Sequence, residues 1–196
     1  MISRPPVLIT APAALPVALA DVKQHLRVDH DDENSLITAY IEAATAHLDG
    51  YSGALGRALI NQEWRQDFDG FCRILRLPLP NVSAAAVTYD DADGVEQTVD
   101  SGSFRILSDH MSAYVAASLD TVWPSARMDA GSVRVTFTAG FGDEPADVPA
   151  SLRSAILLMV GDLYENRATV SERGSGRIDM SLTVNALIAP YRRMTI

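Results

Sequence analysis

The sequence predicts an α+β protein in which an antiparallel helical core carries an inserted, mostly antiparallel β region and a C-terminal docking helix or tail. Three observations support this fold class. Apolar residues recur every three or four positions near both ends of the chain, apolar and polar residues alternate over its middle, and glycine and proline separate the two patterns. The 196 residues suffice for one sizeable core, or for a core and one lobe.

The strongest helical pattern covers residues 148–167. Pro149 can occupy the first turn, because no backbone donor is needed there. The apolar face of this helix consists of Leu152, Ile156, Met159, Val160 and Leu163. Burying about six large side chains at roughly 1.5–3 kcal/mol each contributes on the order of 10 kcal/mol, as an upper estimate. We therefore expect the helical core to be built around this helix.

Two shorter helices are expected near the N-terminus. Residues 17–27 carry apolar side chains on one side and charged side chains on the other. The acidic run at 29–33 suits the start of a second helix, with Asp31 or Asp32 as its cap, because carboxylates are favoured there. This helix should end near Gly50. Its apolar stripe consists of Leu36, Ile37, Tyr40, Ile41, Ala44 and Leu48.

The first 15 residues are predicted to form an extended, Pro-rich arm that lies on a neighbouring surface. Arg4, the apolar residues after it and Ala18-Leu19-Ala20 also resemble a secretory signal peptide. Four prolines interrupt that stretch, which favours the arm. No apolar run approaches the roughly 18 residues that a membrane span requires.

Residues 61–140 show the alternation that is typical of strands. The cleanest alternation is at 133–138, and Asp93-Gly94 is a strong hairpin signal between strands at 87–89 and 95–99. Further strands are expected at 62–68, 74–77, 104–107 and 113–117. The β region therefore lies, along the chain, between the second helix and the long one.

Beyond Arg167 the periodicity is lost over residues 168–179, which predicts a flexible loop. A helical stripe then returns at Val184, Leu187, Ile188 and Tyr191. So short a helix is not stable alone, so it must dock on its own core or on a partner. The predicted organisation is an arm at 1–15, a helical core at 16–60 and 141–167, a β insertion at 61–140, and a flexible loop with a C-terminal docking segment at 168–196.

Composition excludes several kinds of site. Sixteen basic and 25 acidic residues give a net charge of −9, which argues against a broad nucleic-acid-binding face. A single cysteine, Cys72, excludes an internal disulfide and a cysteine-rich zinc site. The acidic runs at 29–33 and 90–93 lack ligand positions of a calcium loop, and His25 and His47 have no second ligand at helical spacing. We therefore predict no metal site and no cofactor.

Motifs of catalysis are missing too. The sequence has no nucleophile elbow and no phosphate-binding loop, and its only lysine is Lys23. We predict no catalytic residues, and hence that the protein is not an enzyme. Trp64 and Trp123 leave one alternative open, a ligand- or carbohydrate-binding β module with helical flanks, although such residues more often pack in a core or an interface.

Taken in order, several segments resemble the head-tail connector, or adaptor, family of long-tailed phages, prophages and gene transfer agents. The resemblance covers Leu15 to Arg193 and depends on the order and spacing of its pieces more than on any single one. The pieces are ALADVKQHLRVDHDDENSLITAYIEAATAHLDGYSG, GRALINQEW, RLPLPNVSAAAVTYDDADG, Tyr114 to Pro124, VRVTFTAGFGD, VPASLRSAILLMVGDLYENR and ALIAPYRR.

The resemblance implies a structural protein that forms a homo-oligomeric ring, usually twelve-fold, under the portal of a DNA-filled head. Its partners would be the portal protein and a downstream neck, stopper or tail protein, and double-stranded DNA would pass through without specific binding. It would involve no membrane, would reside in the neck of a virion or virion-like particle, and would assemble in the bacterial cytoplasm. The family's C-terminal segment typically reaches the portal. Applied to this sequence, the resemblance implies that the C-terminal segment forms the portal or subunit interface. The candidate interface residues are Leu182, Val184, Leu187, Ile188, Tyr191, Arg192 and Arg193.

Overall fold

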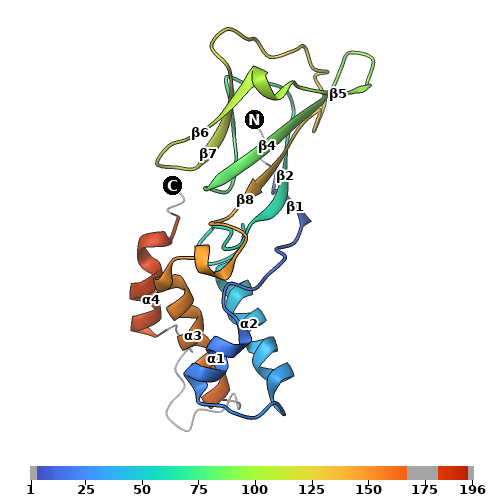
Figure 1. Ribbon diagram of the computed structural model, residues 1–196. Coiled ribbons are helices and arrows are strands. Elements are labelled where there is room, and N and C mark those ends of the chain that lie inside the picture. The colour runs from blue at the N-terminus through green and yellow to red at the C-terminus, as the bar shows by residue number, and fades with distance from the viewer. Residues whose placement is uncertain (1–3, 167–180, 194–196) are drawn as a thin grey trace, which may run out of the picture. The chain divides into compact units, whose positions relative to one another are not determined.

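The computed structural model describes residues 4–166 and 181–193, which form two compact units (Figure 1). The β unit contains residues 4–13 and 61–141, and the helical unit contains residues 14–60, 142–166 and 181–193. Helices and antiparallel sheets both occur, which confirms the predicted α+β class. The predicted loop at 168–179 lies outside the described residues.

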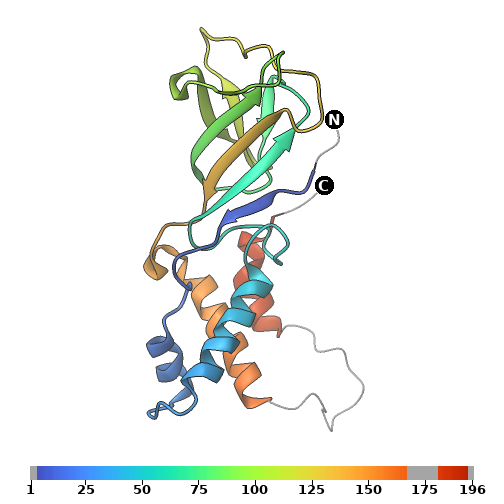
Figure 2. The same ribbon diagram turned by 90° about the vertical axis from the view of Figure 1, so that its right-hand side faces the viewer.

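The helical unit is built from α1 (Leu19–Leu26), α2 (Asn34–Leu48), α3 (Ala150–Glu165) and α4 (Leu182–Ile188). Helix α3 packs against each of the other three helices, as expected for the longest apolar stripe (Figure 2). The side chains that close this core are fully buried: Val22, Ile37, Ile41, Leu48, Leu152, Ala155, Ile156, Val160, Val184 and Ile188. Leu163, which was expected in the apolar face of α3, is 37% exposed, so this face is buried only as far as Val160.

The start of α2 differs from the prediction. Glu33 occupies the cap position, and no side chain there accepts a capping hydrogen bond. Asp31 instead accepts hydrogen bonds from Lys23 Nζ at 2.6 Å and from Asn34 Nδ2 at 3.1 Å. The acidic turn therefore ties α1 to α2 through side chains, and the helix ends beside Gly50, which has a positive φ of 79°.

The β unit contains a five-stranded sheet in the order β1-β2-β8-β4-β5 and a three-stranded sheet in the order β3-β7-β6, both antiparallel. The strands are β1 (Val7–Thr10), β2 (Gln62–Phe68), β3 (Ile74–Arg76), β4 (Val82–Asp90), β5 (Glu96–Thr98), β6 (Phe104–Ser108), β7 (Ala113–Ala117) and β8 (Val133–Ala139). Strand β8 has the predicted alternation: Val133, Val135, Phe137 and Ala139 are buried. The predicted hairpin is formed by β4 and β5, with Gly94 at a φ of 80°.

Two strands were not anticipated in full. Residues 7–10 of the predicted arm form β1, which pairs with β2 at one edge of the sheet. Pro5, Pro6 and Pro12 lie outside this strand, where a missing N–H breaks no sheet hydrogen bond. Strand β4 begins at Val82, five residues earlier than predicted. The alanines at 84–86 have low strand propensity and therefore no strand signal, but they form a strand because they pair with β8.

The two ends of the five-stranded sheet differ. One end is marked by Ala139, which lies opposite both Gln62 and Val82. The chain enters and leaves the β unit close to this end. At the other end Phe68, Tyr89 and Val133 lie in register. Three connections lie at this second end, at residues 69–73, 91–95 and 118–132, and we call them the distal loops. No helix in the described ranges is long and apolar enough to cross a membrane.

Candidate interaction surfaces

The C-terminal helix α4 places the predicted interface residues in two groups. Val184 and Ile188 are fully buried against α3, whereas Leu182 is 89% exposed. Leu187, Tyr191 and Arg193 are partly buried, and Arg192 is exposed. The Ser181 hydroxyl caps the helix by accepting from the Val184 N–H at 3.2 Å. The helix is thus part of the core of the helical unit, and one side of it remains available to a partner.

Three arginines gather where α4 ends. Arg57 donates from Nε to the Tyr191 carbonyl at 2.6 Å, and the Arg193 N–H donates to the Leu55 carbonyl at 3.0 Å. Arg192 donates to Asn185 Oδ1 at 3.2 Å. Burial, and then the nearby charge of Arg193, lower the pKa of the Arg57 guanidinium, although such a group stays charged at neutral pH. We call Arg57, Arg192 and Arg193 the basic corner, a surface suited to carboxylates.

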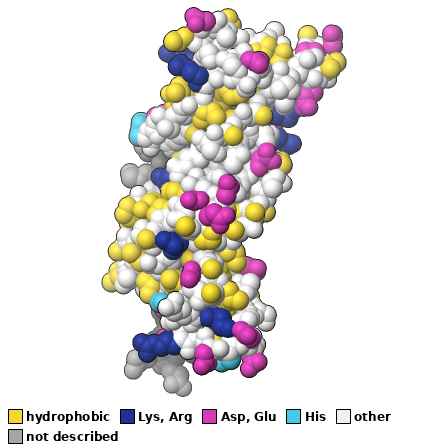
Figure 3. Space-filling view, viewed as in Figure 1, with side chains coloured by type: hydrophobic (Ala, Val, Ile, Leu, Met, Phe, Trp, Pro, Cys, Tyr) yellow, Lys and Arg dark blue, Asp and Glu magenta, His cyan; other side chains and the backbone are white. Residues whose placement is uncertain are grey.

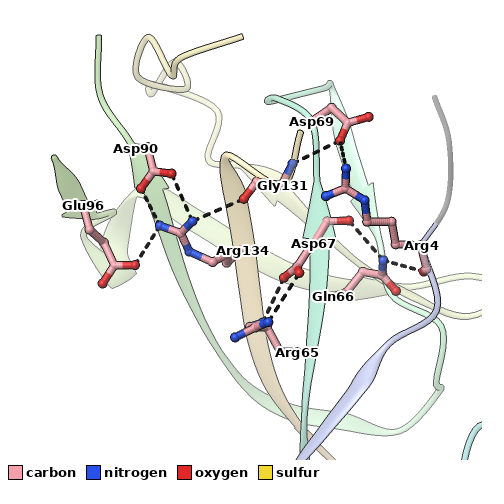
Figure 4. Close-up of polar contacts among 9 residues, drawn as sticks. All are labelled: Arg4, Arg65, Gln66, Asp67, Asp69, Asp90, Glu96, Gly131 and Arg134. Atoms are coloured by element: carbon pink, nitrogen blue, oxygen red, sulfur yellow. Dashed lines mark hydrogen bonds and ion pairs between the residues drawn. The ribbon is translucent and has the colours of Figure 1, made fainter. Parts of the chain in front are cut away.

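Asp90, the first residue of the acidic run at 90–93, binds an arginine within the β unit (Figure 4). Arg134 donates two hydrogen bonds to Asp90, at 2.5 and 3.1 Å, and one to Glu96 at 2.7 Å. The hydrogen bond from Arg134 lowers the pKa of Asp90, and the same contact raises the pKa of Arg134. Arg134 therefore holds the β4–β5 hairpin against β8.

Asp91 shapes the turn of this hairpin. Its Oδ1 accepts from the N–H groups of Asp93 and Val95, each at 3.0 Å, and its Oδ2 accepts from Gln97 at 2.9 Å. The hydrogen bond from the Val95 N–H is the main reason that the pKa of Asp91 is lowered. No group of three or more His, Cys, Asp or Glu side chains in the described residues is placed to hold a metal ion.

A second set of contacts fixes the N-terminal residues to β2 (Figure 4). Gln66 donates to the Arg4 carbonyl at 3.0 Å, and Arg4 pairs with Asp69 at 3.3 Å. Asp69 also accepts from the Gly131 N–H at 3.1 Å. Since Gly131 belongs to the loop before β8, these contacts join the N-terminus, the end of β2 and that loop.

The two tryptophans serve packing. Trp64 is 9% exposed and lies opposite Phe137 in the β2–β8 pair. The Trp123 ring stacks on Phe71 with 4.8 Å between centroids, and Phe71 meets Tyr89 edge-on at 5.5 Å. One ring is therefore buried and one face of the other is covered, so nothing here favours the carbohydrate-binding alternative.

The loop at 118–132 exposes three large apolar side chains. Leu119 is 89% exposed, Val122 is 92% exposed and Met128 is 90% exposed. Sequence reasoning missed this group because single apolar residues in a polar loop have no period that distinguishes an exposed side chain from a buried one.

Comparison with known proteins gave matches of two kinds. Residues 16–70 match the family described as phage gp6-like head-tail connector protein. A chain of the structure entitled "Virion of native gene transfer agent (GTA) particle" is 28% identical, with a TM-score of 0.75 over 97% of this chain and 96% of that one. No curated protein matches the sequence.

Two further matches come from structures of particle necks. A chain in "Neck of native GTA particle computed with C12 symmetry" is 28% identical, with a TM-score of 0.66 over 100% of this chain and 97% of that one. A chain in "Neck of empty GTA particle computed with C6 symmetry" has a TM-score of 0.76 over 98% and 97%, and at 24% identity it supports the fold alone. Together with the family match, these similarities confirm the resemblance seen in the sequence.

Proposed function

We infer that this chain is a structural head-tail connector of the phage gp6-like kind, and that it acts in the neck of a virion or virion-like particle. The observation that carries this inference is similarity over nearly the whole chain, at 28% identity, to a protein in a native gene transfer agent virion. The family match over residues 16–70 supports it independently. Such a protein works by binding other proteins, and we propose that it catalyses no reaction.

We further propose that copies of this chain form a ring, of twelve subunits in the particle, assembled in the cytoplasm of the producing bacterium. The C12 symmetry named for the neck that contains a similar chain supports this arrangement. A ring requires heterologous contacts, in which two different surfaces of each subunit meet. Double-stranded DNA would pass through its centre without specific binding, since each chain carries a net charge of −9 and repels phosphates.

The portal contact is proposed at the exposed side of α4 and the basic corner. Val184 and Ile188 hold the helix on α3, so Leu182, Leu187 and Tyr191 supply the apolar contact. The arginines of the basic corner would pair with carboxylates of the portal. Removing α4 as a whole would uncover the α3 core, so substitutions at exposed positions test this contact better than a truncation does.

Deleting the gene in a producing strain tests the function. We expect DNA-filled heads that carry no tails in electron micrographs, and joined particles when the intact gene is restored. Normally joined particles in the deletion strain would refute the proposal.

Restoring the gene with Leu182→Ser and Arg192→Ser tests the portal contact. We expect isolated heads to lose the connector, while Glu42→Ser, which alters an exposed residue of α2, leaves it bound. If the double variant stays on the heads at the normal level, the portal contact lies elsewhere.

A further inference from the structure

Hydrophobic and acidic side chains both lie on the surface at the end of the β unit that carries the distal loops (Figure 3). Among these loops, the one at 118–132 has the most exposed large apolar side chains, whereas Val95 in the loop at 91–95 is 56% exposed. Leu119, Val122 and Met128 are each about nine-tenths exposed. We call these three residues the apolar tip. All three lie within ten residues of one loop. Large apolar side chains that are grouped and exposed commonly mark a site of protein binding, whereas single exposed ones need no explanation.

Hydrogen bonds fix the backbone of the first part of the loop at residues next to Leu119 and Val122. The Ser118 N–H donates to the Ser103 carbonyl at 2.9 Å, and the Thr121 hydroxyl donates to the same carbonyl at 2.7 Å. The Thr121 N–H closes a turn on the Ser118 carbonyl at 3.0 Å. Leu119 lies within this turn and Val122 directly follows it, so both project from a fixed backbone.

The second part of the loop is fixed in the same way. Trp123, next to Val122, stacks on Phe71. The Arg127 N–H, next to Met128, donates to the Asp90 carbonyl at 2.9 Å. Every residue of the apolar tip therefore adjoins an anchored residue. Ordering a loop on binding costs free energy. Because this loop is already ordered in the unbound chain, little of that cost remains when a partner binds.

Charge indicates what kind of surface the tip fits. The distal loops contain five acidic residues, Asp69, Asp91, Asp93, Asp120 and Asp129, and two basic ones, Arg73 and Arg127, for a net charge of −3. Adding the neighbouring Asp90, Glu96, Arg134 and Arg4 leaves this balance unchanged. Two copies joined symmetrically through this same end would bring like charges together, which disfavours such a pairing. A partner surface with lysine or arginine around an apolar pocket would complement both the negative charge of the distal loops and the apolar side chains of the tip.

We infer that the apolar tip inserts into an apolar pocket bordered by basic residues on the downstream neck protein. This inference rests on the proposed function, in which the other principal partner, the portal, is bound by α4. Central apolar anchors with a charged border are a usual design of protein interfaces, where a few buried side chains provide most of the affinity.

The test uses the deletion strain, with the gene restored as wild type or with Leu119→Ser, Val122→Ser and Met128→Gln together. The altered side chains are exposed, so the purified variant should melt at the wild-type temperature. We expect the heads to keep the connector but the yield of joined particles to fall about tenfold or more, as for loss of interface anchors. Met111→Gln, which alters an apolar side chain of the β6–β7 turn that is 41% exposed, is the matched control and should leave the yield unchanged.

The outcomes separate the two proposals. If the deletion strain itself joins heads to tails, the proposed function fails; if the triple variant restores normal joining to a tailless deletion strain, only the inference about the tip fails. A photo-crosslinking amino acid at position 122 then identifies the occupant in assembled particles. Crosslinks to a neck protein other than the portal are expected. Crosslinks to the portal or to another copy of this chain would overturn the inference.

Discussion

Arg134 shows how much of the β unit depends on single side chains. Its guanidinium binds carboxylates from two other strands, Asp90 at the end of β4 and Glu96 at the start of β5, and also donates to the Gly131 carbonyl at 3.2 Å. Arginine suits this role because its planar group presents several donors in a fixed geometry. The acidic turn at 90–93 is therefore held by a partner from β8, which no local sequence pattern indicates.

The Asp90–Arg134 pair predicts a pH dependence of stability. The folded-state pKa of Asp90 lies below its ordinary value of 3.8, mainly because of the hydrogen bond from Arg134. Its contribution is therefore fully present above about pH 4, and is lost as the pH falls through the lowered folded-state value. We expect Asp90→Asn to reduce the free energy of unfolding near neutral pH, and the difference from wild type to shrink below about pH 4.

Urea unfolding of both proteins between about pH 7 and about pH 2 measures this difference. Asp93→Asn, which alters an exposed carboxylate of the same turn, is the control. A difference that stays constant over this whole pH range would mean that the ionised pair does not cause it.

At the scale of elements, α4 and β1 show that a segment's role depends on what it packs against. The stripe on α4 was predicted to dock on its own core or on a partner, and two of its residues, Val184 and Ile188, close the helical core. Strand β1 was predicted as an extended arm, and it forms the edge of a sheet through pairing with residues more than 50 positions away, such as Val7 with Arg65. Both outcomes depend on surfaces supplied by distant segments.

The burial of α4 predicts a contrast between two of its residues. Ile188→Ala removes a fully buried side chain and should cost about 2–5 kcal/mol of unfolding free energy. Leu182→Ala alters a side chain that is 89% exposed and should change it by less than about 0.5 kcal/mol. Thermal or urea unfolding of the two variants checks this. Equal stability of both would show that α4 does not belong to the core in solution.

For the whole molecule, charge is the property that bears most directly on function. A net charge of −9 with a single lysine suits a protein that lies beside DNA without holding it. The basic corner is a local exception, and it fits a protein partner better than a duplex, because neutralising many phosphates requires a row of cations.

Accordingly, the purified protein should not retard double-stranded DNA in a gel at about 0.15 M salt, even at protein concentrations of about 10 μM, where weak non-specific binders begin to do so. The measurement should be repeated at lower salt, where attraction to phosphates would be strongest. Retardation that grows as the salt is lowered would contradict the proposed passive role toward DNA.

The sequence by itself determined the elements whose signals are local. The stripe of α3, the alternation of β8 and the Asp93-Gly94 turn were all predicted, because helix period, strand period and turn chemistry act between residues close along the chain. The order of segments also indicated the head-tail connector family.

Only the tertiary structure decided which apolar residues are buried and which remain exposed. Val184 lies in the core and Leu182 does not, although both belong to one short helix, and Leu119, Val122 and Met128 stay in solvent on an anchored loop. Burial depends on the side chains that other segments bring to the same place, and that information is not contained in any one stretch of sequence.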